Sequence, residues 1–324
     1  MYRLASSLLL AGLFALATAT LVVAQDYPTK PVTFVTPAAA GNSPDVIIRL
    51  VADRLTQLWK QQVIVINRPG AGGLIAAQAA AGLPNDGYSL YLTQASSYTV
   101  LPIHEGSRMP VDLHKAFVAV GMVGEQPIAL GVQKDVKANN VAELIDLANK
   151  TPGGLFFGAT NRGGQTHLTG ELFRDRAKAN ITFVHAAGAA ASLNDVIAGR
   201  IPMMFEGLAG LMPGTGSGAV RLLAIATDKR LPNIPDLPTI AETVPGVVST
   251  GWVLMMAPVG VPAPIIEELN RDLRTVTAQP DLQERFRQIG TYSRDFSPAD
   301  TEAFIRSEEK LWWPIVERVE ATSK

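Results

Sequence analysis

The sequence predicts an α/β protein of two lobes, each with a parallel sheet that carries helices on both faces. Short apolar runs of strand length alternate with longer segments of helical periodicity. The alternation runs from residue 32 to residue 93 and begins again after about residue 117. The length of 324 residues is enough for two lobes of ordinary size.

The first series of elements is regular. Residues 45–60 form a helix, because their apolar side chains recur at helical spacing. Turns rich in glycine and proline, at residues 68–73 and 84–87, separate the later elements. In order, the expected elements are a strand at 32–36, the helix at 45–60, a strand at 63–66, a short helix at 74–81 and a strand at 88–93.

The second series repeats this order. The clearest helix covers residues 141–150, with Asn139 and Asn140 before it as possible caps. The expected strands lie at 118–123, 128–132, 155–159, 181–185, 203–205 and 220–226, and the other helices at 166–176 and 192–198.

The end of the chain returns to the first lobe. Proline becomes dense from Pro232 to Pro245, which is typical of a connection. A strand at 252–257 follows, then helices at 264–278 and 281–289 and a last helix that begins near 298–300. We expect lobe 1 to comprise residues 25–126 and 250–324, with lobe 2, residues 127–249, inserted into it. Crossings at about 124–128 and 248–254 would then form a hinge around a ligand cleft.

The N-terminus has the features of a secretory signal. A short positive start, Met1-Tyr2-Arg3, precedes an apolar run at residues 8–23 and the small-residue site that ends at Ala24. We expect residues 1–24 to be a signal peptide cleaved after Ala24, and the mature protein to reside in the periplasm. The alternative, an uncleaved membrane anchor, is disfavoured because the run is short for a bilayer span.

The composition argues against several functional classes. Lys and Arg number 28 against 29 for Asp and Glu, so no basic face for nucleic acid is expected. The chain has no cysteine, and its four histidines are not at metal-ligand spacing. No Gly-x-Ser-x-Gly elbow is present, and residues 214–218 resemble a flexible turn. Residues 70–73 resemble a phosphate loop only loosely. We therefore expect no catalytic residue, no metal and no cofactor.

Three loops rich in small residues are the candidate binding elements. They cover residues 37–44, 160–166 and 186–191, and each lies between the end of a predicted strand and the start of a helix. Small residues let a ligand approach the backbone closely. The free N–H groups and the dipole of a helix N-terminus favour an anion. A carboxylate can therefore be bound there without Arg or Lys.

At these loops the sequence resembles the substrate-binding proteins of tripartite tricarboxylate transporters, the TctC or Bug family. The resemblance rests on residues 27–31, 67–73, 86–90, 164–173, 237–242 and 257–262, in this order and spacing. It implies a type II periplasmic binding protein fold that closes on a carboxylated ligand and delivers it to membrane permease subunits. The ligand contacts that it implies are Ala39, Ala40, Gly41, Asn42, Asp45, Ser96, Ser97, Thr160, Gly164, Gln165, Thr166, Ala186, Ala187, Gly188 and Glu206.

The loops depart from the family pattern at positions that determine which ligand is bound. Ala38 stands where the family commonly has an aromatic residue, and Ala186 and Ala187 stand where it often has Tyr and Lys. Glu206 replaces a common Asp. These changes leave more apolar room, which favours an aromatic or medium-chain carboxylate over citrate or an acidic amino acid. A monomer is expected. Two alternatives stay open: a sensory module that signals to a histidine kinase, and a secreted α/β hydrolase, for which no nucleophile–base pair is visible.

Overall fold

The computed structural model describes residues 27–159, 163–186 and 188–321. In these residues nine strands form one sheet of order β2-β1-β3-β9-β4-β7-β5-β6, and β8 pairs with β4 off this path. The strands are β1 (Val32–Thr36), β2 (Val63–Asn67), β3 (Ser89–Gln94), β4 (Phe117–Gln133), β5 (Leu155–Ala159), β6 (Ile181–His185), β7 (Met203–Gly207), β8 (Val220–Ile225) and β9 (Thr250–Pro258).

Most predicted helices are confirmed within three residues at each end. The α-helices are α2 (Ser43–Trp59), α3 (Leu74–Ala81), α4 (Ala95–Thr99), α5 (Leu101–Glu105), α6 (Leu113–Ala116), α7 (Val141–Lys150), α8 (Gln165–Ala177), α9 (Ala189–Ile197), α10 (Leu208–Gly216), α11 (Ala263–Thr277), α12 (Pro280–Gln288) and α13 (Pro298–Ala321). The 3-10 turns are η1 (Ala71–Gly73), η2 (Gly106–Arg108) and η3 (Ile240–Glu242).

The prediction of two strands at 118–123 and 128–132 was wrong. They are parts of one strand of 17 residues, β4. The intervening segment stays extended because it pairs with β9, with Gly124 opposite Val253 and Pro127 opposite Thr250. Glycine and proline therefore mark no break here.

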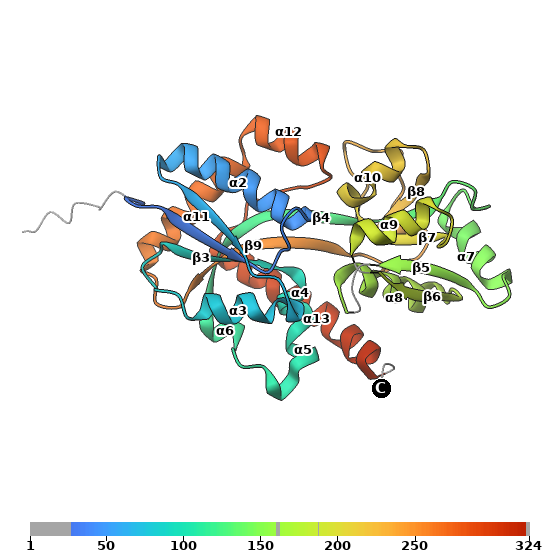
Figure 1. Cartoon of the computed structure of the whole chain (residues 1–324), viewed down its shortest axis with the longest axis horizontal. Coiled ribbons are helices and arrows are strands. Elements are labelled where there is room, and N and C mark those ends of the chain that lie inside the picture. The colour runs from blue at the N-terminus through green and yellow to red at the C-terminus, as the bar shows by residue number, and fades with distance from the viewer. Residues whose placement is uncertain (1–26, 160–162, 187, 322–324) are drawn as a thin grey trace, which may run out of the picture.

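The partners of β4 change along its length. From Phe117 to Pro127 it pairs with β9, and from Ile128 onward it pairs with β7 and β8. Figure 1 shows the result, which is two groups of elements joined by β4 and β9. The first group contains β1 to β3, and the second contains β5 to β8. The exact lobe boundaries given above stay a prediction.

Strand direction places the loops of the two groups opposite each other. Strands β1 to β3 are parallel to one another, and β3 and β4 are each antiparallel to β9, so β1 to β3 run in the same direction as β4. Strands β5 to β7 are parallel to one another and run against β4. The carboxyl ends of both sets therefore point toward the middle of β4, where ligands bind in open α/β sheets.

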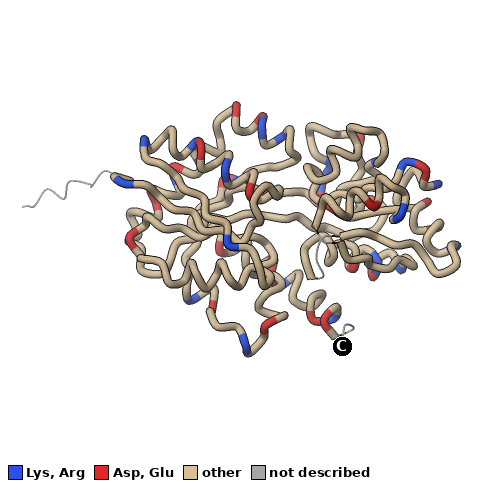
Figure 2. Tube along the Cα trace, in the orientation of Figure 1, with Lys and Arg blue, Asp and Glu red and all other residues tan. Residues whose placement is uncertain are grey.

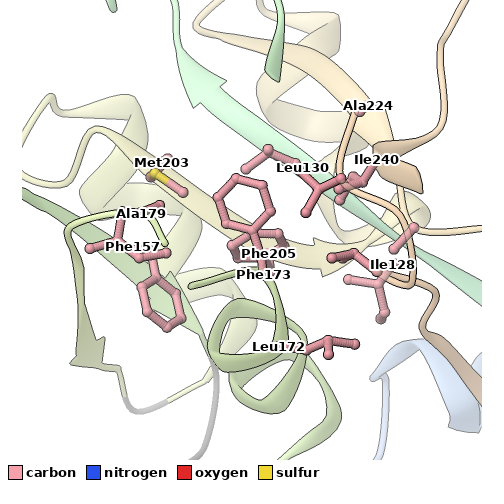
Figure 3. Close-up of a cluster of buried hydrophobic side chains, with 14 of the residues drawn as sticks. Ile128, Leu130, Phe157, Leu172, Phe173, Ala179, Met203, Phe205, Ala224 and Ile240 are labelled. Atoms are coloured by element: carbon pink, nitrogen blue, oxygen red, sulfur yellow. The ribbon is translucent and has the colours of Figure 1, made fainter. Parts of the chain in front are cut away.

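Apolar clusters cover both faces of each half of the sheet. In the first group, α2 and α11 pack on one face, while α3 and the start of α13 pack on the other. In the second group, α9 and α10 bury one face. On the opposite face, Phe157, Phe173 and Phe205 form the centre of the cluster shown in Figure 3. Each group is thus a three-layer α/β/α unit with its own core.

Helix α13 belongs to both groups. Near its start, Ile305 lies in a cluster with β3 and β9 residues. Farther along, Trp312, Ile315 and Val316 lie in the cluster of the second group. Arg318 pairs with Asp175 of α8 at 2.6 Å. The last helix is therefore a third link between the two groups.

The expected flexible turn at residues 214–218 is also corrected. The segment up to Gly216 is helical and forms the end of α10, which buries Leu208 and Leu211. A Cβ atom on Gly214 would lie 2.8 Å from Val220 and 2.9 Å from Leu193. The glycine thus allows α10 to approach its neighbours closely, and small residues here indicate tight packing.

Candidate functional site

The loop between β1 and α2 presents small residues at the start of a long helix. Asn42 is the N-cap of α2, and its side-chain oxygen accepts a hydrogen bond from the Asp45 amide at 3.0 Å. Ala39, Ala40 and Gly41 are exposed. The cap fixes the direction of the helix while leaving the preceding backbone accessible.

Asp45 organises this loop. Its buried carboxylate accepts hydrogen bonds from the Gly41 amide at 2.8 Å, from Arg49 at 2.9 Å and from Asn67 at 2.7 Å. Asn67 also donates to the carbonyl of Ala38 at 2.9 Å. Burial raises the pKa of this carboxyl, but the hydrogen bonds from Arg49, Gly41 and Asn67 outweigh it and hold the pKa below its usual value. The carboxylate of Asp45, an expected contact residue, is therefore already hydrogen-bonded by the loop, by α2 and by β2.

Several amides of this loop remain available. Those of Ala39, Ala40 and Ser43 have no hydrogen-bond partner in the part of the chain that the structure describes. The amides of Gly41 and Asn42 are already occupied within the loop. The free amides lie at the positive end of a helix of 17 residues, which is a favourable place for an anion.

The two expected serines after β3 lie in different surroundings. Ser96 is partly exposed, whereas Ser97 is fully buried with its hydroxyl 3.3 Å from the Tyr91 hydroxyl. A Cβ atom on Gly73 would lie 3.1 Å from the Ser97 oxygen. Gly73 also has a φ of 108°, which favours glycine. Ser97 therefore packs against the turn after β2, and Ser96 is the more accessible of the pair.

The loop between β5 and α8 begins outside the described residues, so the expected contact Thr160 lies outside them as well. Gly164 is the N-cap of α8, with no side-chain cap. Gln165 donates to Ser249 at 2.9 Å, and Ser249 lies 2.7 Å from the Thr169 hydroxyl. Thr166 is buried in the first turn of the helix. Ser249 precedes β9, so this network ties α8 to the strand by which the chain returns to the first group.

His167 has a structural role. It is almost fully buried, and its Nδ1 accepts a hydrogen bond from the Gly163 amide at 2.9 Å. Its other ring nitrogen faces Glu171 at 3.5 Å. Because both ring nitrogens are engaged inside the protein, His167 acts as a structural residue.

The loop between β6 and α9, like the loop between β1 and α2, leads from the end of a strand to the start of a helix. Ala186 is buried, Ala187 lies outside the described residues, and Gly188 is the N-cap of α9. The amides of Ala189 and Ala190 have no partner among residues 27–159, 163–186 and 188–321. A second helix N-terminus is thus open, this time in the second group.

Glu206 is the second-last residue of β7, two residues before α10 begins. Its Oε1 accepts a hydrogen bond from the Gly207 amide at 2.9 Å. Its Oε2 is buried and has no partner in the described structure. Burial raises the pKa of this carboxyl to about 7, and the hydrogen bond from Gly207 opposes the shift.

The two groups contact each other beside these loops. Val100, which follows α4, lies in the same apolar cluster as Ile128 of the second group. On the other side, Leu208 of α10 packs against Gly290, where a Cβ atom would lie 2.8 Å from the leucine. The loops at the strand ends therefore lie between two places where the groups meet.

Sequence reasoning missed some of these residues. Ser249 is a single small residue in a proline-rich connection, and no motif marks it. Among the described residues, no group of His, Asp and Glu is arranged to hold a metal ion. Within the same residues, no helix combines the length and apolar character needed to cross a bilayer.

Comparison with known proteins identifies the family. Residues 47–321 match the model of the tripartite tricarboxylate transporter family receptor, TctC. The chain belongs to this family. A UPF0065 protein of Bordetella bronchiseptica is 35% identical over 305 residues, which are 94% of this chain and 90% of that protein. The resemblance drawn from the sequence motifs is confirmed.

Solved structures of TctC-type proteins share the fold. The structure of R. palustris Rpa4515 with adipate has a TM-score of 0.80 and 32% identity, and the match covers 91% of this chain and 98% of that one. The periplasmic binding protein BugD gives a TM-score of 0.78 and 27% identity, with 91% and 99% covered. The predicted periplasmic binding protein fold is confirmed. This TctC-family chain is a solute-binding transporter receptor and not an enzyme.

Proposed function

We propose that this receptor binds a carboxylated organic acid in the periplasm and presents it to the permease subunits of a tripartite transporter. The acid would lie between lobe 1, residues 25–126 and 250–324, and lobe 2, residues 127–249. One observation carries the proposal: open helix N-termini of both groups lie at strand ends that point toward each other. Their amides supply the donors that an anion needs.

The proposed ligand class is an aromatic or medium-chain carboxylate. Ala39 and Ala40 of the first loop are exposed and offer no charge or hydrogen-bonding side chain. The basic residue that follows this loop in α2, Arg49, is already paired with Asp45 at 2.9 Å. Adipate, a medium-chain dicarboxylate, accompanies the related Rpa4515 structure. These features support a ligand whose carboxylate is bound by backbone amides and whose remaining atoms lie in apolar surroundings.

A thermal-shift screen of organic acids, followed by calorimetric titration, tests this proposal. Because a ligand that binds only the folded form raises the melting temperature, aromatic and aliphatic acids should stabilise the protein. Citrate and glutamate serve as the comparison. Tight binding of citrate or glutamate, with no response to the other acids, would contradict the proposed ligand class.

A matched pair of variants tests the helix N-termini. Ala190 and Ala142 are both exposed and are each the second residue of a helix, α9 and α7. A glutamate at either position has similar effects on helix stability. Only Ala190→Glu places a negative charge among the proposed ligand donors, and it should weaken acid binding at least tenfold. Equal affinities for the two variants would contradict the placement of the site.

Export is proposed from residues 1–24, which lie outside the described residues. Cleavage after Ala24 predicts that the mature chain begins at Gln25. N-terminal sequencing of protein recovered from the periplasm checks this. A chain that retains Met1 and stays with the membrane fraction would indicate an uncleaved anchor instead.

A further inference from the structure

Glu206 is a buried acid whose carboxylate is only partly hydrogen-bonded within the described structure. The residue is 9% exposed, and Oε2 has no hydrogen-bond partner in the described part of the chain. The side chain lies against the first turn of α10, because a Cβ atom on Gly210 would lie 2.7 Å from its Cγ. An unpaired carboxylate is costly in such a place.

No cation compensates Glu206 among the described residues. The residue opposite it on β4 is Ala129, and neither β5 nor α10 carries a titratable side chain. Arg162, between β5 and α8, lies outside the described residues. On β4, Glu125 is paired with Arg294. On α8, Glu171 contacts both His167 and Arg174, Asp175 is paired with Arg318, and Arg176 lies beside Gly246. On α9, Asp195 is paired with Arg200.

The position of Glu206 makes it relevant to the ligand. It stands at the carboxyl end of β7, the edge at which the β5–α8 and β6–α9 loops also begin. A neutral carboxyl group has one O–H donor, which an ionised one lacks. Burial without a cation favours the neutral form, and the pKa of about 7 means that both forms are populated near neutral pH.

We propose that Glu206 is a specificity-determining residue whose neutral carboxyl donates a hydrogen bond from Oε2 to an oxygen of the bound acid. This inference rests on the proposed function and deepens it. Since the ionised fraction of Glu206 must become neutral, ligand binding is then coupled to the uptake of a proton by this carboxyl. It favours acids with a second acceptor oxygen, such as dicarboxylates. Ligands with an ammonium group would instead select the ionised form and bind better at high pH.

Calorimetric titration with adipate at pH 6 and pH 8 tests the inference. If only the neutral form can bind adipate, the dissociation constant should be about tenfold lower at pH 6 than at pH 8, since the apparent dissociation constant is inversely proportional to the binding-competent fraction. Titration at pH 7 in buffers of different ionisation enthalpy should show net proton uptake. Glu206→Gln keeps a neutral donor, so it should bind adipate with little pH dependence and no uptake.

Glu308→Gln is the control variant. Glu308 of α13 is a partly buried acid whose pKa is also raised, first by burial, but its carboxylate accepts a hydrogen bond from Trp252 at 3.0 Å. This variant should retain the pH dependence of the wild-type protein. If Glu308→Gln abolishes that dependence and Glu206→Gln preserves it, Glu206 is not the responsible group.

A ligand-free measurement separates the two proposals. Carbon-13 NMR of labelled glutamate carboxyls, with Glu206→Gln for assignment, should show Glu206 titrating near pH 7. An ordinary titration near pH 4 to 5 would overturn the role of Glu206, whatever the ligand. Failure of every organic acid to bind, with Glu206 titrating near 7, would instead overturn the proposed function and the ligand contact with it.

Discussion

The side-chain amide of Asn67 holds the carboxylate of Asp45, with Nδ2 2.7 Å from Oδ1. The same nitrogen donates to the carbonyl of Ala38 at 2.9 Å. One residue at the end of β2 thus fixes both the strand end and the first helical turn of the neighbouring βα unit. The shape of the β1–α2 loop is therefore set before any ligand arrives.

Asn67→Ala should destabilise the protein by about 1–3 kcal/mol, because it leaves a buried carboxylate oxygen and a carbonyl without their donor. Urea unfolding monitored by circular dichroism measures the change. Asn139→Ala is the control, since the exposed Asn139 is bonded only through its backbone amide. Exposed sites of this kind are expected to change stability by less than about 0.5 kcal/mol. Equal effects for the two variants would show that the Asn67 contacts are unimportant.

Asp45 should contribute to acid unfolding. Its pKa is lower in the folded protein than in the unfolded chain, so its stabilisation is complete above the unfolded pKa of about 4 and is lost as pH falls through the folded value. Asp45→Asn should therefore be less stable than the wild type at neutral pH, and the difference should shrink below about pH 4. Unfolding curves between pH 2 and pH 7 check this, and a difference that does not vary with pH would contradict it.

Gly170→Ala should destabilise the second group by about 1–3 kcal/mol through overpacking. A Cβ atom at this position of α8 would lie 2.1 Å from the ring of Phe157, which is fully buried. Helix propensity alone would favour alanine by about 1 kcal/mol. Gly216→Ala at the end of α10, where the new atom meets nothing within 4 Å, is the matched control and should be neutral or stabilising. A stabilised Gly170→Ala protein would show that α8 can shift away from the sheet.

Thr166→Val should weaken acid binding by about 1–3 kcal/mol if the hydroxyl donates to the ligand. Thr166 is buried in the first turn of α8, two residues after the N-cap Gly164. Titration calorimetry with the acid that gives the largest thermal shift measures the loss. Thr275→Val on α11, whose hydroxyl bonds only to the Arg271 carbonyl, is the control. An unchanged dissociation constant would remove Thr166 from the site.

The alternation of apolar strands and periodic helices was sufficient to predict the α/β class. Local signals also placed α7 at Val141–Lys150, where the side chain of Asn140 provides the cap. The continuity of β4 could not be predicted, because Gly124 and Pro127 break strands locally and only their pairing with β9 keeps them extended. Helix α10 was missed for a similar reason, since glycines that favour turns instead serve close packing.

The sequence was sufficient to predict which loops form the candidate site. It was not sufficient to predict what each side chain in them contacts. Position after a strand and before a helix predicted where Asn42 and Gly188 lie. It could not show that the Asp45 carboxylate is already held within the protein, because Asn67 of β2 approaches it only in the fold. The missing partner of Glu206 likewise depends on burial, which a single sequence does not reveal.

Helix α13 has a consequence for how the protein can move. Trp312 lies buried in the second group, while the neighbouring Trp313 donates to the carbonyl of Tyr98 in the first at 3.1 Å. Pro314 follows immediately and removes one backbone donor from the helix. Any movement that bends β4 and β9 must also bend helix α13 or break its contacts with one of the two groups. If the two groups move relative to each other, the surroundings of this tryptophan pair should change, and tryptophan fluorescence should report that movement.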